Sequence, residues 1–282
     1  MEQVPAIERI LCPVDFSECS VSAYRYAQSL AWRLRAELVV QHIVELWQHP
    51  CSYYAASVQL FEEFQNKLMA DARHDLEQFI NLSGGAQPEC LVQEGLAADA
   101  VLSLARERSV GLIVMGTHGR RGFDRLTLGS VAERVLRHVA CPVLAVRETA
   151  DDSAPIRRIL CCVDFSANAE RALEYALSLA RAYDAEVTVL HVLDDISNSA
   201  AVTERLEKLV PPASRGATKI HLELRLGRAY REILQFAAEE HSDVIVTGVQ
   251  GRHALDLAVF GSTTHRVIQL GAAPVLAVPL SA

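Results

Sequence analysis

The chain repeats itself, and this repeat constrains the fold more than any other feature of the sequence. The stretch RILCPVDFS that begins at Arg9 returns as RILCCVDFS at Arg158, a shift of 149 residues. Further along the shift is 132 residues, since PVLAV at Pro142 returns at Pro274. In a chain of 282 residues such a repeat predicts two copies of one domain, each large enough for its own core.

The two shifts also locate the domain boundaries. We expect domain 1 at 1–150 and domain 2 at 151–282, joined by a short polar segment at 148–155 that ends in proline. The difference between the shifts gives the first copy 17 extra residues between its second and third expected strands.

Within each copy, short apolar runs alternate with helical patterns. The first copy has predicted strands at 10–14, 38–43, 89–93, 112–115 and 143–146, with helices that include 97–107 and 130–138. Such alternation is typical of a parallel sheet with helices on both faces. The predicted fold is α/β, two tandem copies of an open, doubly wound, five-stranded parallel sheet. Ligands of such sheets bind beyond the carboxyl ends of the strands, where the strand order reverses.

Composition limits the classes of function. The net charge is −8 and no run of five basic residues occurs, so we expect no binding to nucleic acid or to anionic membranes. Apolar runs are too short for a membrane span. Seven irregularly spaced cysteines, and a start without a basic segment followed by an apolar one, indicate a cytoplasmic protein without disulfides or a signal peptide.

The strongest functional signal follows the fourth predicted strand of each copy. Both copies carry the pattern G-x2-G-x9-G-S, formed by Gly116, Gly119, Gly129 and Ser130 and by Gly248, Gly251, Gly261 and Ser262. Glycines let the backbone turn tightly around an anion, and the amides and dipole at the start of the next helix favour a phosphate there. Identical spacing in two copies argues against ordinary turns.

With the early V-D-F-S element, these loops make the sequence similar to the universal stress protein family in its tandem-domain form, over nearly the whole chain. The resemblance implies an adenine nucleotide alpha-hydrolase-like fold, and family members that keep the loop bind ATP. It also implies that the last strand of each domain pairs the two domains within the chain, as a pseudo-dimer. A homodimer through the same strands is a further expectation.

The resemblance assigns a nucleotide site to each domain. Asp15 and Asp164 would contact the adenosine; because Ser17 and Ser166 already stand at the helix caps, these carboxylates are not needed there. The base would lie against Pro13, Ile43 and Met115 in domain 1 and against Cys162, Val192 and Thr247 in domain 2. Ribose and phosphates would be held by Gly116, Gly119, Gly129, Ser130 and Val131, and by Gly248, Gly251, Gly261, Ser262 and Thr263. Copy two departs from the family pattern where it has Cys162 for the proline and Thr247 for the methionine.

Arg120 and Arg252 lie within the loops, where they would either offset phosphate charge or only be solvated. Other notable residues are expected to be structural. His42 and His191 lie inside apolar strands, and the vicinal pair Cys161-Cys162 belongs to a strand predicted to be buried. The inserted region 44–87 is predicted to form an amphipathic helix that covers the sheet edge or the nucleotide cleft, with a partner surface as the alternative.

Three classes of function remain open. The first is a regulatory protein of the stress response whose conformation or partner choice depends on bound ATP, ADP or AMP, with or without Mg²⁺. The second is a slow ATPase or autokinase, although a P-loop lysine, an evident base and paired carboxylates for magnesium are missing from the loops. The third is an interaction module that works without nucleotide. We expect the first, with no catalytic residue and no metal held by side chains alone.

Overall fold

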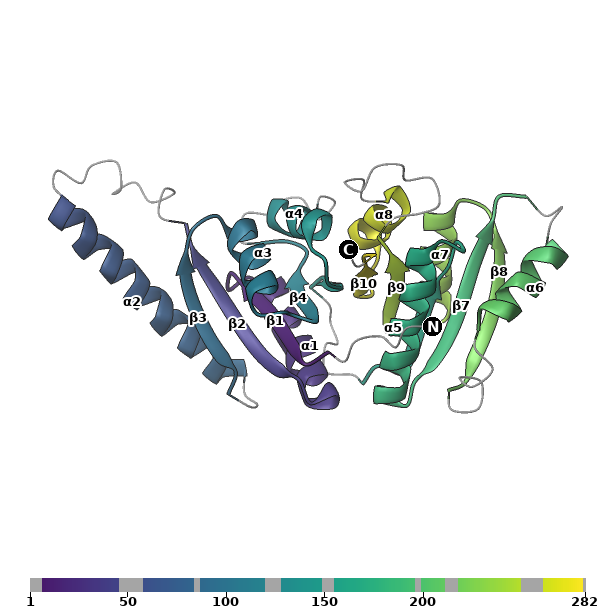
Figure 1. Ribbon diagram of the computed structural model, residues 1–282, viewed down its shortest axis with the longest axis horizontal. Coiled ribbons are helices and arrows are strands. Elements are labelled where there is room, and N and C mark those ends of the chain that lie inside the picture. Colours follow the sequence, from purple (N-terminus) through teal and green to yellow (C-terminus); the bar gives the residue numbers. More distant parts are fainter. Residues whose placement is uncertain are drawn as a thin grey trace.

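Strands and helices alternate along the chain as the sequence predicts (Figure 1). The computed structural model describes residues 7–45, 58–83, 87–119, 128–148, 155–195, 199–210, 218–249 and 261–280. The elements of the first repeat are β1 (Arg9–Val14), α1 (Glu18–Leu34), β2 (Glu37–Val44), α2 (Val58–Ser83), β3 (Glu89–Glu94), α3 (Ala97–Glu107), β4 (Leu112–Gly116), α4 (Ser130–His138) and β5 (Val143–Val146). Those of the second repeat are β6 (Arg158–Cys162), α5 (Ala167–Tyr183), β7 (Glu186–Leu193), α6 (Ser199–Leu209), β8 (Ile220–Leu226), α7 (Ala229–Glu239), β9 (Val244–Gly248), α8 (Ser262–Leu270) and β10 (Val275–Val278).

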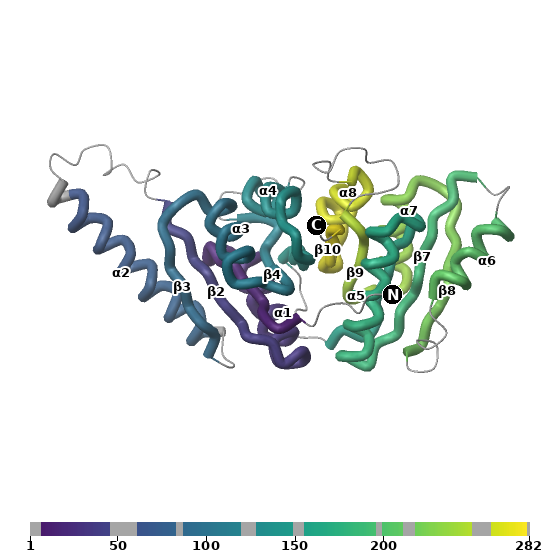
Figure 2. Tube along the Cα trace, viewed as in Figure 1, coloured from purple at the N-terminus to yellow at the C-terminus, as the bar shows by residue number. Residues whose placement is uncertain are grey.

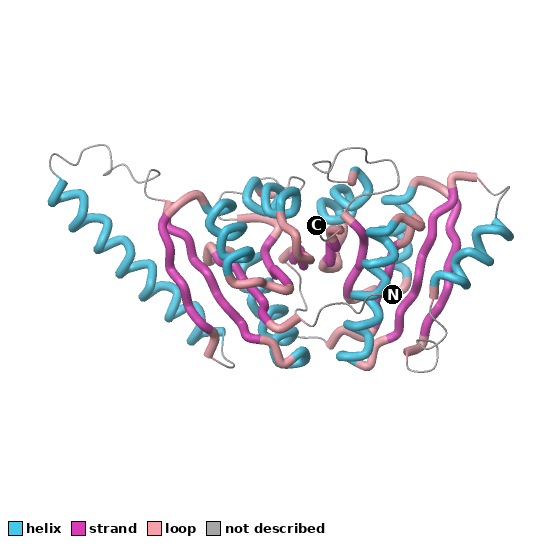
Figure 3. The backbone as a smooth tube through the Cα atoms, viewed as in Figure 1, coloured by secondary structure: helices cyan, strands magenta, loops and turns pink. Residues whose placement is uncertain are grey.

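The strands of the described residues join one continuous sheet, in the order β3-β2-β1-β4-β5-β10-β9-β6-β7-β8. Figure 3 shows these strands in magenta, with helices beside them. Within each repeat the five strands are parallel, which confirms the predicted fold class. The chain runs outward from β1 to β3 and returns to place β4 on the other side of β1. The strand order therefore reverses between β1 and β4, and between β6 and β9 in the second repeat. These are the positions where ligands of doubly wound sheets bind.

Helices cover both faces of the sheet. One apolar cluster joins α1, α2, α5 and α6 to one face, and a second cluster joins α3, α4, α7 and α8 to the other. The stripe predicted for α1 supplies the first of these clusters, since Ala23, Ala27 and Leu30 are fully or almost fully buried. The same stripe recurs on α5, where Ala172, Ala176 and Leu179 are buried. Equivalent residues of the two repeats thus pack in the same way against the sheet.

The two repeats meet through their last strands. β5 and β10 pair antiparallel, with Leu144 opposite Leu276, its own counterpart in the repeat. A residue that faces its own counterpart is what a local two-fold axis requires. All residues of both strands are buried. In a single repeat the last strand would be an exposed apolar edge of the sheet, and here the last strand of the other repeat covers it. The intrachain pairing implied by the family resemblance is confirmed.

One arginine crosses this seam. Arg147 follows β5, and its Nη1 donates hydrogen bonds to the carbonyl oxygens of Gln269 (2.5 Å) and Gly271 (3.4 Å) at the end of α8. Carbonyl groups at a helix end lack intrahelical partners, and the helix dipole favours a cation there. The counterpart of Arg147 in the repeat is Pro279, whose side chain has no donor. The cap is therefore made in one direction only.

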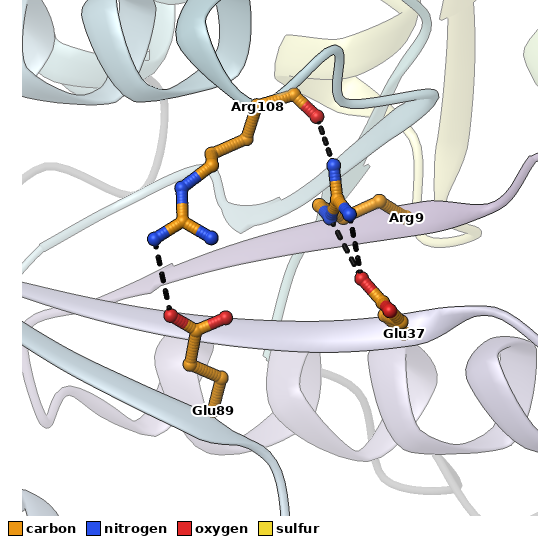
Figure 4. Close-up of polar contacts among 4 residues, drawn as sticks. All are labelled: Arg9, Glu37, Glu89 and Arg108. Atoms are coloured by element: carbon orange, nitrogen blue, oxygen red, sulfur yellow. Dashed lines mark hydrogen bonds and ion pairs between the residues drawn. The ribbon is translucent and has the colours of Figure 1, made fainter.

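Polar contacts fix the edge of the sheet where the strands begin (Figure 4). Arg9 at the start of β1 donates to Glu37 at the start of β2 (Nε to Oε2 2.9 Å, Nη2 to Oε2 2.7 Å), and its Nη1 donates to the carbonyl of Arg108 after α3. Arg108 in turn pairs with Glu89 at the start of β3 (3.3 Å). In the second repeat Arg158 donates to the C-cap carbonyl of α7 in the same way (2.8 Å). This edge lies opposite the glycine loops.

The inserted region of the first repeat forms a long helix, as predicted. α2 has 26 residues whereas α6, at the same place in the second repeat, has 11. Leu76 and Ile80 of α2 are buried in the cluster against the sheet, and α2 extends past β3 at one end of the molecule (Figure 2). The helix packs on one face of the sheet over β2 and β3, while much of the edge strand β3 stays exposed. The aromatic residues of the preceding 46–57 segment lie outside the described residues.

The cap across the seam predicts a stability effect. Arg147→Ala should lower the free energy of unfolding by about 1–2 kcal/mol, because two carbonyls at the end of α8 lose a charged donor. The matched control is Arg137→Ala, which removes an exposed pair with Glu133 on one helix and should cost about 0.5 kcal/mol or less. Urea unfolding followed by circular dichroism measures both. Equal losses in the two variants would contradict the role of Arg147.

Candidate functional site

Asp15 follows β1, and its carboxylate organises the turn into α1. Oδ1 accepts hydrogen bonds from the backbone N–H of Ser17 (3.1 Å), from the hydroxyl of Ser17 (2.6 Å) and from the hydroxyl of Ser20 (2.6 Å). An aspartate that accepts from the N–H two residues on forms an Asx turn. Phe16 between them has φ 64°, an uncommon conformation for a bulky residue. The half-buried carboxylate is therefore held at the carboxyl edge of the sheet.

The second repeat builds the same turn. Oδ1 of Asp164 accepts from the N–H (3.0 Å) and the hydroxyl (2.5 Å) of Ser166, and Phe165 has φ 61°. Ala169 stands where the first repeat has Ser20, so that hydroxyl is missing. The predicted caps are confirmed, because the side chains of Ser17 and Ser166 each accept from an N–H in the first turn of α1 or α5.

A histidine on the next strand supports each turn. The ring of Phe16 stacks on His42 with centroids 4.3 Å apart, and His42 Nδ1 lies 2.8 Å from the carbonyl oxygen of Val14. The second repeat has the same pair, with Phe165 and His191 rings 4.6 Å apart and Nδ1 2.7 Å from the Val163 carbonyl. Because a carbonyl only accepts, Nδ1 is the protonated nitrogen. Both histidines are structural, as predicted.

The first glycine of each loop is required by packing. A Cβ on Gly116 would lie 2.9 Å from Cβ of Cys19 in α1, and one on Gly248 would lie 2.8 Å from Cβ of Asn168 in α5. Helix and strand end therefore approach more closely than a side chain would permit. These two glycines have a structural role whether or not a ligand binds.

The second glycine brings the loop against the carboxylate. A Cβ on Gly119 would lie 2.5 Å from Oδ2 of Asp15, too close for any other residue without movement. Asp15 and the loop after β4, about a hundred residues apart in sequence, are thus adjacent at the switch point. The counterpart Gly251 lies outside the described residues, and so do Arg120 and Arg252.

The last glycine of each loop is the N-cap residue of the next helix. The N–H of Gly129 donates to the carbonyl of Thr117 (2.8 Å), and that of Gly261 donates to the carbonyl of Val249 (2.8 Å), so both amides are used within the loops. α4 and α8 begin one residue later, and a glycine at the N-cap has no side chain that could accept from the amides of the first turn. The first backbone bond of α4 runs from Glu133 to Gly129, which leaves the amides of the preceding turn without an intrahelical partner. Such amides suit an anion.

Three further predicted residues stand at the ends of neighbouring strands in domain 1. Pro13 and Met115 are buried, and Ile43 between β1 and β3 is half-buried. Val131 in the first turn of α4 packs on the same cluster as Met115. Together they form an apolar floor beside Asp15.

Domain 2 has a more polar floor. Thr247 replaces methionine, and its hydroxyl lies 3.3 Å from that of Thr264, which donates to the carbonyl of Gly248 (2.8 Å). Cys162 is buried and Val192 half-buried. Burial raises the pKa of the Cys161 and Cys162 thiols, both of which are free, so the core role predicted for this pair is confirmed. Ser262 and Thr263 open α8 at the surface.

Sequence reasoning missed two supporting residues. Ser20 orients Asp15 but has no counterpart in the repeat, so comparison of the copies hid it. Glu45 directly follows β2, and its Oε1 accepts from the N–H of Ala97 (3.2 Å), which caps α3. An acidic residue after an apolar strand is the signal that could have identified it. His118 in the first glycine loop is half-buried, with Nδ1 2.9 Å from the hydroxyl of Thr117.

Other features of the described residues do not form this site. An apolar hollow between α1 and α5, lined in part by Leu30, Leu144 and Leu276, includes residues where the strands begin, far from the loops. No group of three or more His, Cys, Asp or Glu side chains is arranged to hold a metal ion in the part of the chain that the structure describes. Within that same part, every helix is too short or too polar to cross a membrane.

Known proteins resemble this chain in sequence and in fold. The sequence model of the universal stress protein family matches residues 6–147 and again residues 155–279. A universal stress protein of Mycolicibacterium smegmatis is 26% identical over 300 residues, which cover 95% of this chain and 96% of that one. One of Methanocaldococcus jannaschii is 30% identical over 141 residues, 50% of this chain and 82% of that one. The crystal structure of a universal stress protein from Archaeoglobus fulgidus superposes with a TM-score of 0.74 at 23% identity, covering 97% and 98% of the two chains. The chain belongs to the universal stress protein family, with two tandem family domains.

Proposed function

We propose that each domain binds an adenine nucleotide at its switch point, and that the protein is a nucleotide-dependent regulator of the stress response. ATP is the proposed ligand, with ADP and AMP as related forms. The observation that carries the proposal is the contact between the carboxylate of Asp15 and the loop at Gly119, next to the uncapped start of α4. A fixed acceptor and open backbone donors at one edge match a nucleoside with phosphates.

Different residues would contact different parts of the nucleotide. Asp15 and Asp164 would accept hydrogen bonds from the adenosine, over the floors formed by Pro13, Ile43 and Met115 and by Cys162, Val192 and Thr247. The phosphates would lie at the open first turns of α4 and α8, beside Ser130, Val131, Ser262 and Thr263. Any Mg²⁺ would enter with the nucleotide and balance phosphate charge. We propose one nucleotide site in domain 1 (residues 1–150) and one in domain 2 (residues 151–282).

Binding rather than turnover is the proposed activity. Oδ1 of Asp15 already accepts from Ser17 and Ser20, so this oxygen is committed to the turn and is poorly placed to activate a water. Hydrolysis would be slow at most. The protein is proposed to act in the cytoplasm. The homodimer stays a prediction, and because β5 and β10 each have neighbours on both sides, a second copy would have to meet another surface.

A charge placed at the open helix starts should abolish binding without unfolding the protein. Ser130→Glu with Ser262→Glu puts a carboxylate where the phosphates would lie, and an acid at a helix N-terminus is favourable to the helix. A ligand at about 100 times its Kd stabilises the native state by roughly 2.7 kcal/mol. We expect ATP to raise Tm by roughly 5–10 °C in the native protein, stripped of nucleotide, and not in the double variant.

The control for this experiment is Ser130→Gln with Ser262→Gln, which has a similar volume and no charge and should keep most of the shift. GTP tests base specificity. A Tm shift that survives in the double glutamate variant would place the nucleotide elsewhere. An unshifted native protein that is folded would favour the nucleotide-independent interaction module.

The two sites should fill independently. Because both repeats build the same turn, calorimetric titration should give two ATP per chain, and one per chain after Ser130→Glu or Ser262→Glu alone. Phosphate release by the native protein should not exceed that of the double variant. A release rate that falls when both serines are replaced would instead favour the slow ATPase.

A further inference from the structure

The outer surface of α7 and α8 carries an arginine cluster around one tyrosine. Arg231 Nε donates to the hydroxyl of Tyr230 (3.0 Å), and its guanidinium carbon lies 5.8 Å from the centroid of the tyrosine ring. Arg266 of α8 lies over the same ring, with its guanidinium carbon 4.7 Å from the centroid. Arg228 precedes α7 by one residue. The three arginines are exposed, and Tyr230 is half-buried.

The cluster has no internal counter-charge. Among the described residues, no carboxylate lies within 4 Å of the guanidinium of Arg228, Arg231 or Arg266. Glu232, in the same turn of α7, lies over Gly227 instead. Some other arginines of the chain do pair with carboxylates, as Arg137 does with Glu133 and Arg225 with Glu239. Three arginines without a carboxylate partner in the described part of the chain thus lie together on one surface, in a chain of net charge −8.

The first repeat shows the same surface in a neutral form. Asp99 occupies the position of Arg231, and Arg134 that of Arg266, and these two side chains form an ion pair (2.7 Å). Leu96 and Ala98 replace Arg228 and Tyr230. The fold of α3 on α4 therefore needs no cationic surface. Packing of α7 on α8 therefore does not by itself explain the arginines of domain 2.

The tyrosine holds the guanidinium groups in place. The hydrogen bond to Arg231 fixes one of them, and the cation–π contact positions the other. The same arginines lower the pKa of the Tyr230 hydroxyl, the hydrogen bond from Arg231 being the main cause. Arginine side chains that are already ordered lose less entropy when they bind a carboxylate. Tyrosine and arginine are also the residues most enriched at the energetic centres of protein interfaces.

We propose that Arg228, Tyr230, Arg231 and Arg266 form a docking surface for an acidic segment of a partner protein, specific to domain 2. Planar guanidinium groups pair with carboxylates through two parallel hydrogen bonds, which matches glutamate and aspartate side chains. A short acidic segment is favoured over a long polyanion, because a long one would extend past the cluster over the rest of a chain of net charge −8. The surface is independent of the proposed nucleotide binding.

The test measures fluorescence anisotropy of a labelled peptide rich in Glu and Asp, without nucleotide, against the same peptide with Gln and Asn. We expect the full-length protein to bind only the acidic peptide. Binding should be weaker at physiological ionic strength than at low ionic strength, because salt screens the charges and the Debye length is then about 8 Å. Arg231→Asp gives domain 2 the charges that domain 1 has at these two positions, where Asp99 and Arg134 form an ion pair. It should weaken peptide binding about fivefold or more.

The converse variant is the matched control. Asp99→Arg with Leu96→Arg gives domain 1 a cationic surface beside Arg134, and should raise the number of peptides bound per chain. This variant keeps the proposal testable even if Arg231→Asp were to unfold. An affinity unchanged by Arg231→Asp in folded protein would overturn the proposal. Binding of polyphosphate or single-stranded DNA in place of the acidic peptide would overturn it as well.

Discussion

The antiparallel pairing of β5 with β10 is the interaction on which the rest of the molecule depends. Each of these strands is short and apolar, and each would be an open edge of its own five-stranded sheet. Backbone hydrogen bonds between them remove both edges and make one sheet of the two repeats. The glycine loops inherit their positions from this sheet, since Thr117 and Val249 donate from the loop starts to the last residues of β5 and β10 (both 2.9 Å). A disturbance of the seam would reach both candidate sites.

Much of the fold follows from local signals in the sequence. The helices at 97–107 and 130–138 have their predicted bounds, because the helical periodicity of their apolar residues is clear there. The predicted strands differ from the observed ones by a residue or so at their ends, where pairing with a neighbour rather than the residue's own preference decides the boundary. The order of the ten strands depends on contacts between distant segments. The repeat indicated only that one arrangement occurs twice, and the family resemblance implied that the last strands of the two copies pair.

The candidate site was less visible in the sequence than the fold. The glycines and Asp15 are short-range signals, but what joins them is a contact between a loop and a strand end far apart in the chain. The structure gives two of the glycines a packing role that spacing alone does not reveal, since Gly116 and Gly248 allow α1 and α5 to approach. The use of the Gly129 amide inside the loop also depends on tertiary geometry. Residues present in one copy only, such as Ser20, gave no repeat signal at all.

Arg147 shows what fusion of two domains permits. A dimer of identical chains carries every substitution twice, once on each side of its axis, so a contact across the axis must be acceptable in both directions. In this chain the arginine is present on one side and Pro279 on the other, and only the end of α8 receives the cation. Joining the copies in one polypeptide freed each half to change alone. The molecule keeps the architecture of a symmetric pair while its halves evolve as different proteins.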